Sequence, residues 1–187
     1  MNHFDLPHYR RQEIEDVLLQ LLPDIPYQQI TVKDLTDRLQ ISRKTFYHYF
    51  HSKQACLEAL MDRFILECNL GLLKLPKNAS RQELYAERLR FWIRHKTFLD
   101  AVIRDNLGSV LVERILLYIR REDSVLPLRL STREIPCDED VLFFFISGQI
   151  HLILKWCSEG FTRPLEEMAQ KTMRLVYQPL LPEETSK

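Results

Sequence analysis

The sequence lacks the features that mark several protein classes. Gly accounts for 4 of its 187 residues, and no stretch shows the alternation of β-branched and polar residues that is typical of strands. Both facts favour an all-α chain without a phosphate-cradling glycine loop. The chain opens without a charged-then-apolar leader, and no apolar run approaches about 18 residues, the usual length of a membrane span. We therefore expect a soluble, cytoplasmic protein with no membrane partner.

Cysteines are few and widely spaced. Cys56, Cys68, Cys137 and Cys157 form no C-x-x-C pair, which favours reduced thiols over a zinc site or a disulfide framework. The sequence shows no nucleophile–base constellation and no carboxylate pair at a definable site, so we expect no enzyme activity, no metal and no cofactor. Lys+Arg and Asp+Glu number 26 each, so a nucleic-acid partner has to be argued from where the charges lie.

Apolar residues recur with helical spacing through most of the chain. In the first such segment, 8–22, they are Ile14, Val17, Leu18, Leu21 and Leu22. Further helices are expected over 31–40, 42–50, 52–73, 80–95, 97–107, 110–121, 138–159 and 163–178. The helix over 52–73 would span roughly 30 Å, enough to join two domains. The helix over 138–159 is apolar nearly all round, which predicts burial on several sides.

Two short helices joined by a tight turn precede the long one. Thr31 and Asp34 have the spacing of a capping box at the start of the first, and Ser42 can cap the second. At about 100° per residue, the second helix has an inner face of Phe46, Tyr49 and Phe50 and an opposite face of Lys44, Tyr47 and His48, with Arg43 at the border. This arrangement predicts one packed side and one cationic, hydrogen-bonding side.

The outer face of the second short helix suits DNA. A helix of this size fits the major groove, where Arg43 and Lys44 are the candidate base readers. Side chains suited to phosphate lie at the helix starts nearby: Thr31, Lys33, Ser42, Thr45 and Lys53. The alternative is ordinary solvated surface, because seven basic residues of the N-terminal region face seven acidic ones. The outward aromatic ring of Tyr47 favours a surface that a partner covers.

Residues 31–60 resemble the DNA-binding region of the TetR family of bacterial transcription regulators. The resemblance is carried by Ile41-Ser42, Thr45-Phe46-Tyr47, Tyr49-Phe50 and Ser52-Lys53. It implies an N-terminal three-helix helix-turn-helix DNA-binding domain over 1–53, continuing into the fourth helix, and a helical regulatory and dimerisation domain over 54–187. It also implies a homodimer on palindromic double-stranded DNA. By position, Tyr47 and Lys53 are similar to phosphate contacts, and Arg43, Lys44, Thr45 and His48 to operator contacts.

Two positions depart from the family pattern. Gln40 stands where the turn usually has Gly, so we expect a strained or differently shaped turn. The loop after the first helix has Pro23-Asp24-Ile25-Pro26 in place of the usual aromatic-and-glycine ending. Neither departure removes the recognition face.

The C-terminal half resembles the regulatory domain of a Firmicutes-type branch of the family, through 145–161 and 164–169. This resemblance implies that the last two long helices pair with their copies in a four-helix dimer interface. The candidate interface residues are Gly148, Leu152, Lys155, Trp156, Met168 and Thr172. A packing glycine in a monomer core is the alternative for Gly148.

A small-molecule effector is a possible further partner. Aromatic residues and histidines of the C-terminal half are the candidates for its pocket: Phe64, Trp92, His95, Phe98, Phe144 and His151. Plain core residues and structural histidines are the alternative. The sequence thus predicts a DNA-binding regulator, most simply a repressor that a small ligand releases or modulates. The competing hypothesis is a degenerate TetR-like interaction module that acts as a co-regulator without ligand-controlled DNA release.

Overall fold

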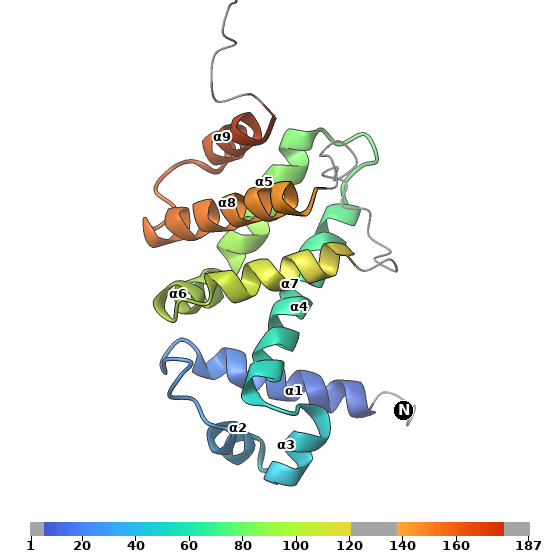
Figure 1. Cartoon of the computed structure of the whole chain (residues 1–187), viewed down its shortest axis with the longest axis vertical. Helices are drawn as coiled ribbons and strands as arrows, with labels where there is room; N and C mark the ends of the chain where they lie inside the picture. The colour runs from blue at the N-terminus through green and yellow to red at the C-terminus, as the bar shows by residue number, and fades with distance from the viewer. Residues whose placement is uncertain (1–5, 121–137, 178–187) are drawn as a thin grey trace, which may run out of the picture.

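The structure, a computed structural model, describes residues 6–120 and 138–177, and all the regular elements in those ranges are helices (Figure 1). The all-α prediction is thereby confirmed for the described chain. The helices run in the order α1 (Leu6–Leu21), α2 (Val32–Leu39), α3 (Arg43–Tyr49), α4 (Lys53–Leu73), α5 (Arg81–Arg94), α6 (Lys96–Arg104), α7 (Gly108–Arg120), α8 (Glu139–Ser158) and α9 (Leu165–Tyr177). Cys137 and the rest of the stretch between the helices expected over 110–121 and 138–159 lie outside the described residues.

Capping residues place the helix starts as the sequence predicted. Thr31 and Asp34 form a capping box at α2, because the Thr31 side chain accepts from the Asp34 N–H and the Asp34 carboxylate accepts from the Thr31 N–H. Ser80 and Glu83 form a second one at α5. Ser42 caps α3 through the Thr45 N–H. These local bonds satisfy N–H groups that a helix cannot pair internally.

The first four helices form one end of the molecule, and α4 rises from it into the rest (Figure 1). All five residues of the predicted α1 stripe are buried, as is Phe46 of α3. The predicted α4 stripe is buried along its whole length, at Leu57, Leu60, Met61, Phe64, Ile65 and Cys68. Burying each such side chain contributes about 1.5–3 kcal/mol, so α4 shares its core with both ends of the molecule.

The helical body packs around the upper part of α4. Helix α8 lies on α6 and α7, while α9 lies on α5. Helix α6 ends at Arg104, earlier than the expected 107, because Asn106 takes a left-handed φ of 54°. Gly108 begins α7, and a Cβ there would lie 3.1 Å from Leu154 Cδ1. The absence of a side chain thus lets α7 start close against α8.

Helix α8 differs from its prediction in two ways. Burial on several sides was expected, but Phe143 is 52% exposed and Phe144 71% exposed. Its buried residues, Ile150, Ile153, Leu154, Trp156 and Cys157, lie in its second half. By length and mean hydropathy α8 could cross a membrane, contrary to the sequence expectation, although a core helix of a soluble protein meets the same test. Its first half therefore presents apolar surface outward.

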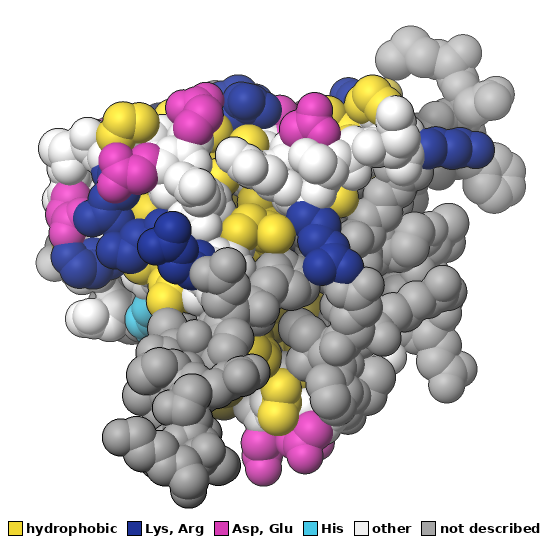
Figure 2. Space-filling view, turned by 90° about the horizontal axis from the view of Figure 1, so that it is seen from above, with side chains coloured by type: hydrophobic (Ala, Val, Ile, Leu, Met, Phe, Trp, Pro, Cys, Tyr) yellow, Lys and Arg dark blue, Asp and Glu magenta, His cyan; other side chains and the backbone are white. Residues whose placement is uncertain are grey.

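The body end opposite α2 and α3 carries mixed charge. Viewed from above, Lys and Arg side chains gather beside Asp and Glu side chains, with hydrophobic ones between them (Figure 2). In α8 and after it, Lys155 pairs with Glu159, and Arg163 pairs with Glu167 at 3.4 Å. Exposed pairs of this kind contribute little to stability. A cationic surface without neighbouring acidic side chains is therefore expected at the other end of the molecule, where α2 and α3 lie.

Candidate nucleic-acid interface

The turn between α2 and α3 forms without glycine. Gln40 takes the left-handed conformation, with φ 53° and ψ 41°. Its N–H donates to the Asp37 carbonyl at 3.2 Å, and the Ile41 N–H donates to the Thr36 carbonyl at 3.0 Å. The shape of the turn is therefore kept at the cost of holding a side-chain-bearing residue in a region that favours glycine.

Helix α3 has the two faces that the sequence predicted. Phe46 and Phe50 are buried and Tyr49 is half-buried. Tyr47 is 54% exposed and meets the Phe46 ring edge-on, with 5.4 Å between ring centres. This contact holds an exposed aromatic side chain in a defined orientation beside the first turn of the helix.

Two cations on α3 are unpaired. Arg43 and Lys44 are exposed and make no ion pair with another residue in the part of the chain that the structure describes. His48 is exposed on the same helix, and the ring of Tyr49 lies edge-on to it at 5.0 Å. Charges without intramolecular partners are free to meet phosphate or base edges.

The other predicted contacts already have partners within the chain. Lys33 Nζ lies 2.6 Å from Asp37 Oδ2, and Thr31 belongs to the capping box. Ser42 Oγ and Thr45 Oγ1 are 2.9 Å apart, with Ser42 also capping the helix. Each of these side chains is at the surface or half-buried, so a phosphate would share or exchange their present hydrogen bonds.

Lys53 is placed differently from the outer residues of α3. Its Nζ donates to the carbonyl oxygens of Tyr27 and Ile30, both at 2.6 Å, and to that of Gln28 at 3.4 Å. The ammonium also lies 4.2 Å from the centre of the Tyr27 ring. Burial lowers the pKa of Lys53 against the opposing effect of Asp34. A phosphate contact by Lys53 would require its amine to leave these oxygens.

The same loop is bound from the body at the end of α6. Arg104 donates to the carbonyl oxygens of Leu22, Pro23 and Ile25 at 2.8–3.1 Å. The Asp105 carboxylate pairs with Arg104 and accepts from the Tyr27 N–H at 3.0 Å, and these bonds keep the pKa of Asp105 below its usual value. These contacts between the end of α6 and the loop between α1 and α2 were not predicted from the sequence, because the partners lie about 80 residues apart and no local motif marks them.

Tyr27 is the centre of this loop and was also missed. It is buried, and its hydroxyl donates to Gln54 Oε1 at 3.1 Å. Burial, with smaller effects of Cys56 and Glu58, raises its pKa to about 12. Its position in a stretch without helical periodicity gave no signal of burial.

Three of the predicted effector residues pack against one another and leave no space between them. The Phe64 ring lies 4.5 Å from Phe98 and 4.7 Å from His95, and Phe91 lies 4.4 Å from His95, between ring centres. Burial lowers the pKa of His95, and Arg94 adds to this against Glu67. Phe64, His95 and Phe98 are therefore a packed aromatic cluster, as the alternative interpretation held.

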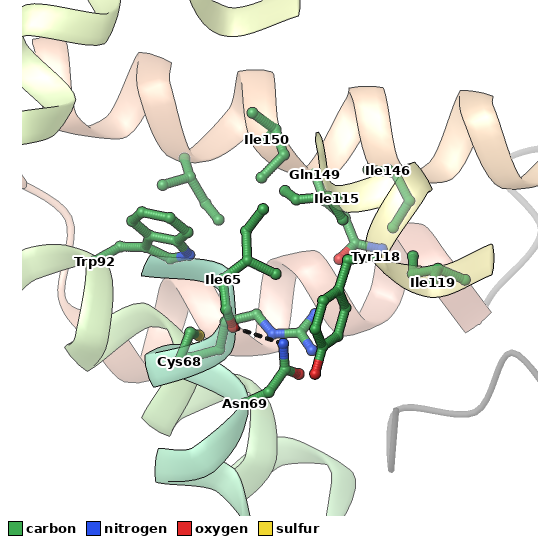
Figure 3. Close-up of a pocket in the computed structure, with 12 residues that line it drawn as sticks. Ile65, Cys68, Asn69, Trp92, Ile115, Tyr118, Ile119, Ile146, Gln149 and Ile150 are labelled. Atoms are coloured by element: carbon green, nitrogen blue, oxygen red, sulfur yellow. Dashed lines mark hydrogen bonds between the residues drawn. The ribbon is translucent and has the colours of Figure 1, made fainter. Parts of the chain in front are cut away.

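Two further predicted effector residues lie apart from the cavity inside the body and line other surface hollows. Phe144 lies on the exposed side of α8, and His151 is exposed with its Nδ1 2.8 Å from the Ser147 carbonyl oxygen. Neither lines the cavity inside the body, which has a volume of about 50 Å³. Trp92 alone of the six predicted residues lines it, and Figure 3 shows its indole facing Ile65, Ile150 and Ile115.

The predicted dimer residues divide between interior and surface. Trp156 and Met168 are buried within the single chain, and the Trp156 Nε1 donates to the Arg163 carbonyl at 3.1 Å, so both belong to the core of their own chain. Lys155 is exposed and pairs with Glu159. Gly148, Leu152 and the buried Thr172 line a shallow apolar groove between α8 and α9, together with Phe144, Phe145, Gln149 and Leu175.

Comparison with known sequences assigns the N-terminal segment. The sequence model of "Bacterial regulatory proteins, tetR family" matches residues 15–60, the segment from the middle of α1 into α4. Residues 15–60 are thus similar to the TetR family. The matched segment contains the α2–α3 turn and the whole outer face of α3. It ends before the body, where the cavity and the groove lie.

Two curated relatives are also named as transcriptional regulators of the HTH type. The chain is 45% identical over 58 residues to the HTH-type transcriptional regulator EthR of Mycobacterium tuberculosis, a match that covers 31% of this chain and 27% of EthR. It is 23% identical over 182 residues to the uncharacterized HTH-type transcriptional regulator YxbF of Bacillus subtilis, covering 92% of this chain and 46% of YxbF. The chain thus spans less than half the length of either relative. Both are named as regulators and not as enzymes.

A solved TetR-family structure shares the fold along nearly the whole chain. It is the FadR repressor of Thermus thermophilus in complex with lauroyl-CoA, with a TM-score of 0.53 and 18% identity, covering 95% of this chain and 98% of FadR. The likeness supports the arrangement of an N-terminal helix-turn-helix domain and a C-terminal helical domain.

Proposed function

We propose that this protein is a sequence-specific DNA-binding transcription regulator that places α3 in the major groove. The observation that carries the proposal is the outer face of α3, where Arg43 and Lys44 are exposed and have no ion-pair partner within 6–120 and 138–177, beside the oriented ring of Tyr47. Two hydrogen-bond donors near the helix start can reach guanine O6 and N7. Thr31, Lys33, Ser42, Thr45 and His48 then contact phosphates and fix the register.

The active form in this proposal is a homodimer on a palindromic site. Phe144, Gly148 and Leu175 give α8 and α9 an apolar groove at the surface of the single chain, and exposed apolar patches mark interaction sites. A second copy related by a two-fold axis would meet the same patch on itself. Two α3 helices would then read half-sites about one helical turn apart. This function places the protein in the cytoplasm.

Control by a small ligand is the second part of the proposal. The cavity next to Trp92 lies in the body between α4, α7 and α8, and α4 runs from that cavity to the DNA-binding end. A ligand that prefers a different spacing of α4 and α8 would change the distance between the two α3 helices, and so release or modulate a repressor. The ligand-bound FadR structure supports this proposal by likeness of fold.

A co-regulator that binds a protein instead of DNA is the competing function. The observation that favours it is the pairing of charges around α2, including Lys33 with Asp37 and the Thr31–Asp34 capping box. The two functions differ in their dependence on salt, because each phosphate contact releases counterions and adds about 0.9 to the slope of log affinity against log salt.

Selection of bound duplexes from a random pool tests the proposal directly. We expect enrichment of a palindrome whose half-site spacing reports the separation of the two α3 helices. On the selected duplex, Lys44→Ala and Tyr47→Ala should weaken binding about tenfold or more each, and Lys33→Ala, at a proposed phosphate contact, should lower the salt slope by about 1. Lys77→Ala, an exposed cation in the loop before α5, is the matched control. No enrichment, with salt-insensitive binding to random duplex, would favour the co-regulator.

A further inference from the structure

We propose that the cavity next to Trp92 binds a monocarboxylate with an aliphatic chain, and that Arg88 holds the carboxylate. The inference rests on the ligand control proposed above and names the chemical class of the ligand. Its basis is the uneven lining of the cavity, which is aliphatic along most of its wall and, among the residues that the structure describes, carries one cation and no carboxylate.

The largely apolar part of the wall comes from four helices, α4, α5, α7 and α8. Its members are branched side chains and one indole: Ile65, Ile115, Ile119, Ile146, Ile150, Ile153 and Trp92. Figure 3 labels all of them except Ile153. Apart from the indole N–H of Trp92, such a wall offers no hydrogen bond to a polar ring or sugar, and it stabilises a hydrocarbon chain in proportion to the area buried.

The polar part of the wall is built from Arg88, Asn69, Gln149 and Tyr118. Asn69 Nδ2 already donates to the Ile65 carbonyl at 2.7 Å, which leaves its amide oxygen. Asn69, Gln149 and Tyr118 are neutral groups that can add hydrogen bonds to a polar head. Arg88 is the cation of this lining and therefore decides which sign of charge the cavity accepts.

Arg88 is half-buried and lacks a carboxylate partner among the described residues. Its described contact is with the Tyr85 ring, whose centre lies 5.9 Å from Cζ. The neighbouring cations of α5 are arranged differently, because Arg90 and Arg94 both pair with Glu87 at 3.3 Å. A partly buried guanidinium without a counterion is costly, and a carboxylate can accept two parallel N–H bonds from it. A bound monocarboxylate would supply the missing partner.

The volume of the cavity indicates how the ligand would be admitted. About 50 Å³ is far below the roughly 300–1,000 Å³ of ordinary ligand pockets, so the wall must move for a chain to enter. Helix α8 supplies Ile146, Gln149 and Ile150 to the wall, and its first half is covered least by the rest of the chain. Entry of the ligand would therefore displace α8 from α4.

The two tryptophans of the chain allow a direct test without DNA. In a Trp156→Phe variant, Trp92 is the single indole and lies in the cavity wall. Octanoate, octanol and octylamine are titrated while Trp92 fluorescence is followed. We expect a saturable change with octanoate, at least tenfold weaker binding of octanol, and no saturation with octylamine. Isothermal titration of the three probes into the wild-type chain repeats the test without the tryptophan substitution.

Substitutions in α5 locate the carboxylate. Arg88→Met should weaken octanoate binding at least tenfold and leave octanol binding nearly unchanged, and Arg88→Lys should recover part of the loss. Arg90→Met, an exposed cation on the same helix, is the matched control and should bind octanoate as the wild type does.

Three results would overturn the inference: equal binding of octanoate and octanol, preferred binding of octylamine, or no binding of any probe to the wild-type chain. Because the titrations contain no DNA, these results leave the proposed DNA binding to be judged by the duplex selection alone. If the duplex selection fails while octanoate still binds through Arg88, the proposed DNA-binding function is rejected and the proposed ligand site is supported.

Discussion

Lys53 Nζ donates to the carbonyl oxygen of Tyr27 at 2.6 Å and lies 4.2 Å from the centre of the same residue's ring. One side chain at the start of α4 thus binds both the backbone and the side chain of the loop between α1 and α2. Family resemblance assigns Lys53 to phosphate, whereas these contacts give it a role in holding α2 and α3 against α4. The two roles predict different results for the same substitution.

Replacing Lys53 with Met should destabilise the fold. Methionine keeps most of the apolar stem but removes the charged donor from three carbonyl oxygens, and a hydrogen bond to a charged group contributes about 1.5–3 kcal/mol. We expect the free energy of unfolding in urea to fall by about 2 kcal/mol. Lys44→Met, on the exposed face of α3, should change it by less than about 0.5 kcal/mol.

The DNA affinity of the same pair of variants completes the comparison. Lys44→Met should weaken binding and relax the base preference, as expected for a lost base contact, with less effect on the salt slope. Lys53→Met should weaken binding without changing that slope. A Lys53→Met variant of wild-type stability whose salt slope falls by about 1 would show that the amine leaves the loop and contacts phosphate.

The hydrogen bonds between the end of α6 and the loop between α1 and α2 lead to a second prediction. Asp105 accepts from the Tyr27 N–H, and Arg104 donates to three loop carbonyl oxygens. Arg104→Ala should therefore speed hydrogen exchange at the Tyr27 amide at least tenfold, while amides in the middle of α5 keep their protection. Arg94→Ala, which removes an exposed ion pair with Glu87, is the control. Unchanged exchange at Tyr27 would mean that the loop is held by Lys53 alone.

The sequence predicted the parts of this molecule that depend on local chemistry. Helix starts at Thr31, Ser42 and Ser80 follow from caps within three residues, and the two faces of α3 follow from its period. Contacts across the fold were beyond such reasoning. Arg104 donates to the Leu22 carbonyl oxygen, and these two residues come together only when the helical body packs. No sequence pattern near either residue predicts this hydrogen bond.

The same limit explains the errors in the body. Aromatic side chains were assigned to a pocket by type, but Phe64 and Phe98 fill space while Phe144 faces outward. Apolar residues on all sides of α8 predicted burial on all sides. A single chain does not provide it, because the helix is covered mainly along its second half. Composition alone does not say whether an apolar face is covered by its own chain or by another.

The left-handed Gln40 makes a third prediction. A residue with a side chain at φ 53° is disfavoured by roughly 1–2 kcal/mol, and glycine removes that strain while making the unfolded chain more flexible by about 0.4–1 kcal/mol. We expect Gln40→Gly to raise the free energy of unfolding by about 0.5 kcal/mol. Arg38→Gly, in the exposed interior of α2, should lower it by about 1 kcal/mol. Loss of stability in Gln40→Gly would show that the Gln40 side chain makes a favourable contact.

His95 makes a pH prediction. Its imidazole is partly buried between Phe64 and Phe91, and burial lowers its pKa. The unfolded chain then takes up a proton near pH 6.5 while the folded protein does not. The contribution of His95 to stability is therefore complete above about pH 6.5 and is lost as the pH falls towards the folded pKa.

Substitution isolates that contribution from other titrating groups. Urea unfolding of wild type and His95→Gln between about pH 5 and 8 should show a steeper fall of stability with acid in the wild type. His51→Gln, an exposed histidine, should follow the wild-type curve. Parallel curves for wild type and His95→Gln would mean that the pKa of His95 is the same in the folded and unfolded chains, with Glu67 offsetting burial.

The groove of α8 and α9 makes the last prediction. Phe144 is 71% exposed, and a second copy would cover it in the proposed dimer. Phe144→Asp should therefore convert a dimer into a monomer in sedimentation equilibrium without lowering the stability of the chain. Leu117→Asp, on a 44% exposed leucine of α7, should leave the dimer intact.

Two glycines give the sharpest comparison. A Cβ built on Gly148 of α8, or on Gly71 of α4, meets no atom within 4 Å in the single chain. Gly148→Leu and Gly71→Leu should therefore both be tolerated by the monomer, and each gains up to about 1 kcal/mol of helix propensity. If a second copy packs against α8, Gly148→Leu should raise the dimer dissociation constant at least tenfold and Gly71→Leu should not. Equal dissociation constants for the two variants would place the interface away from the groove.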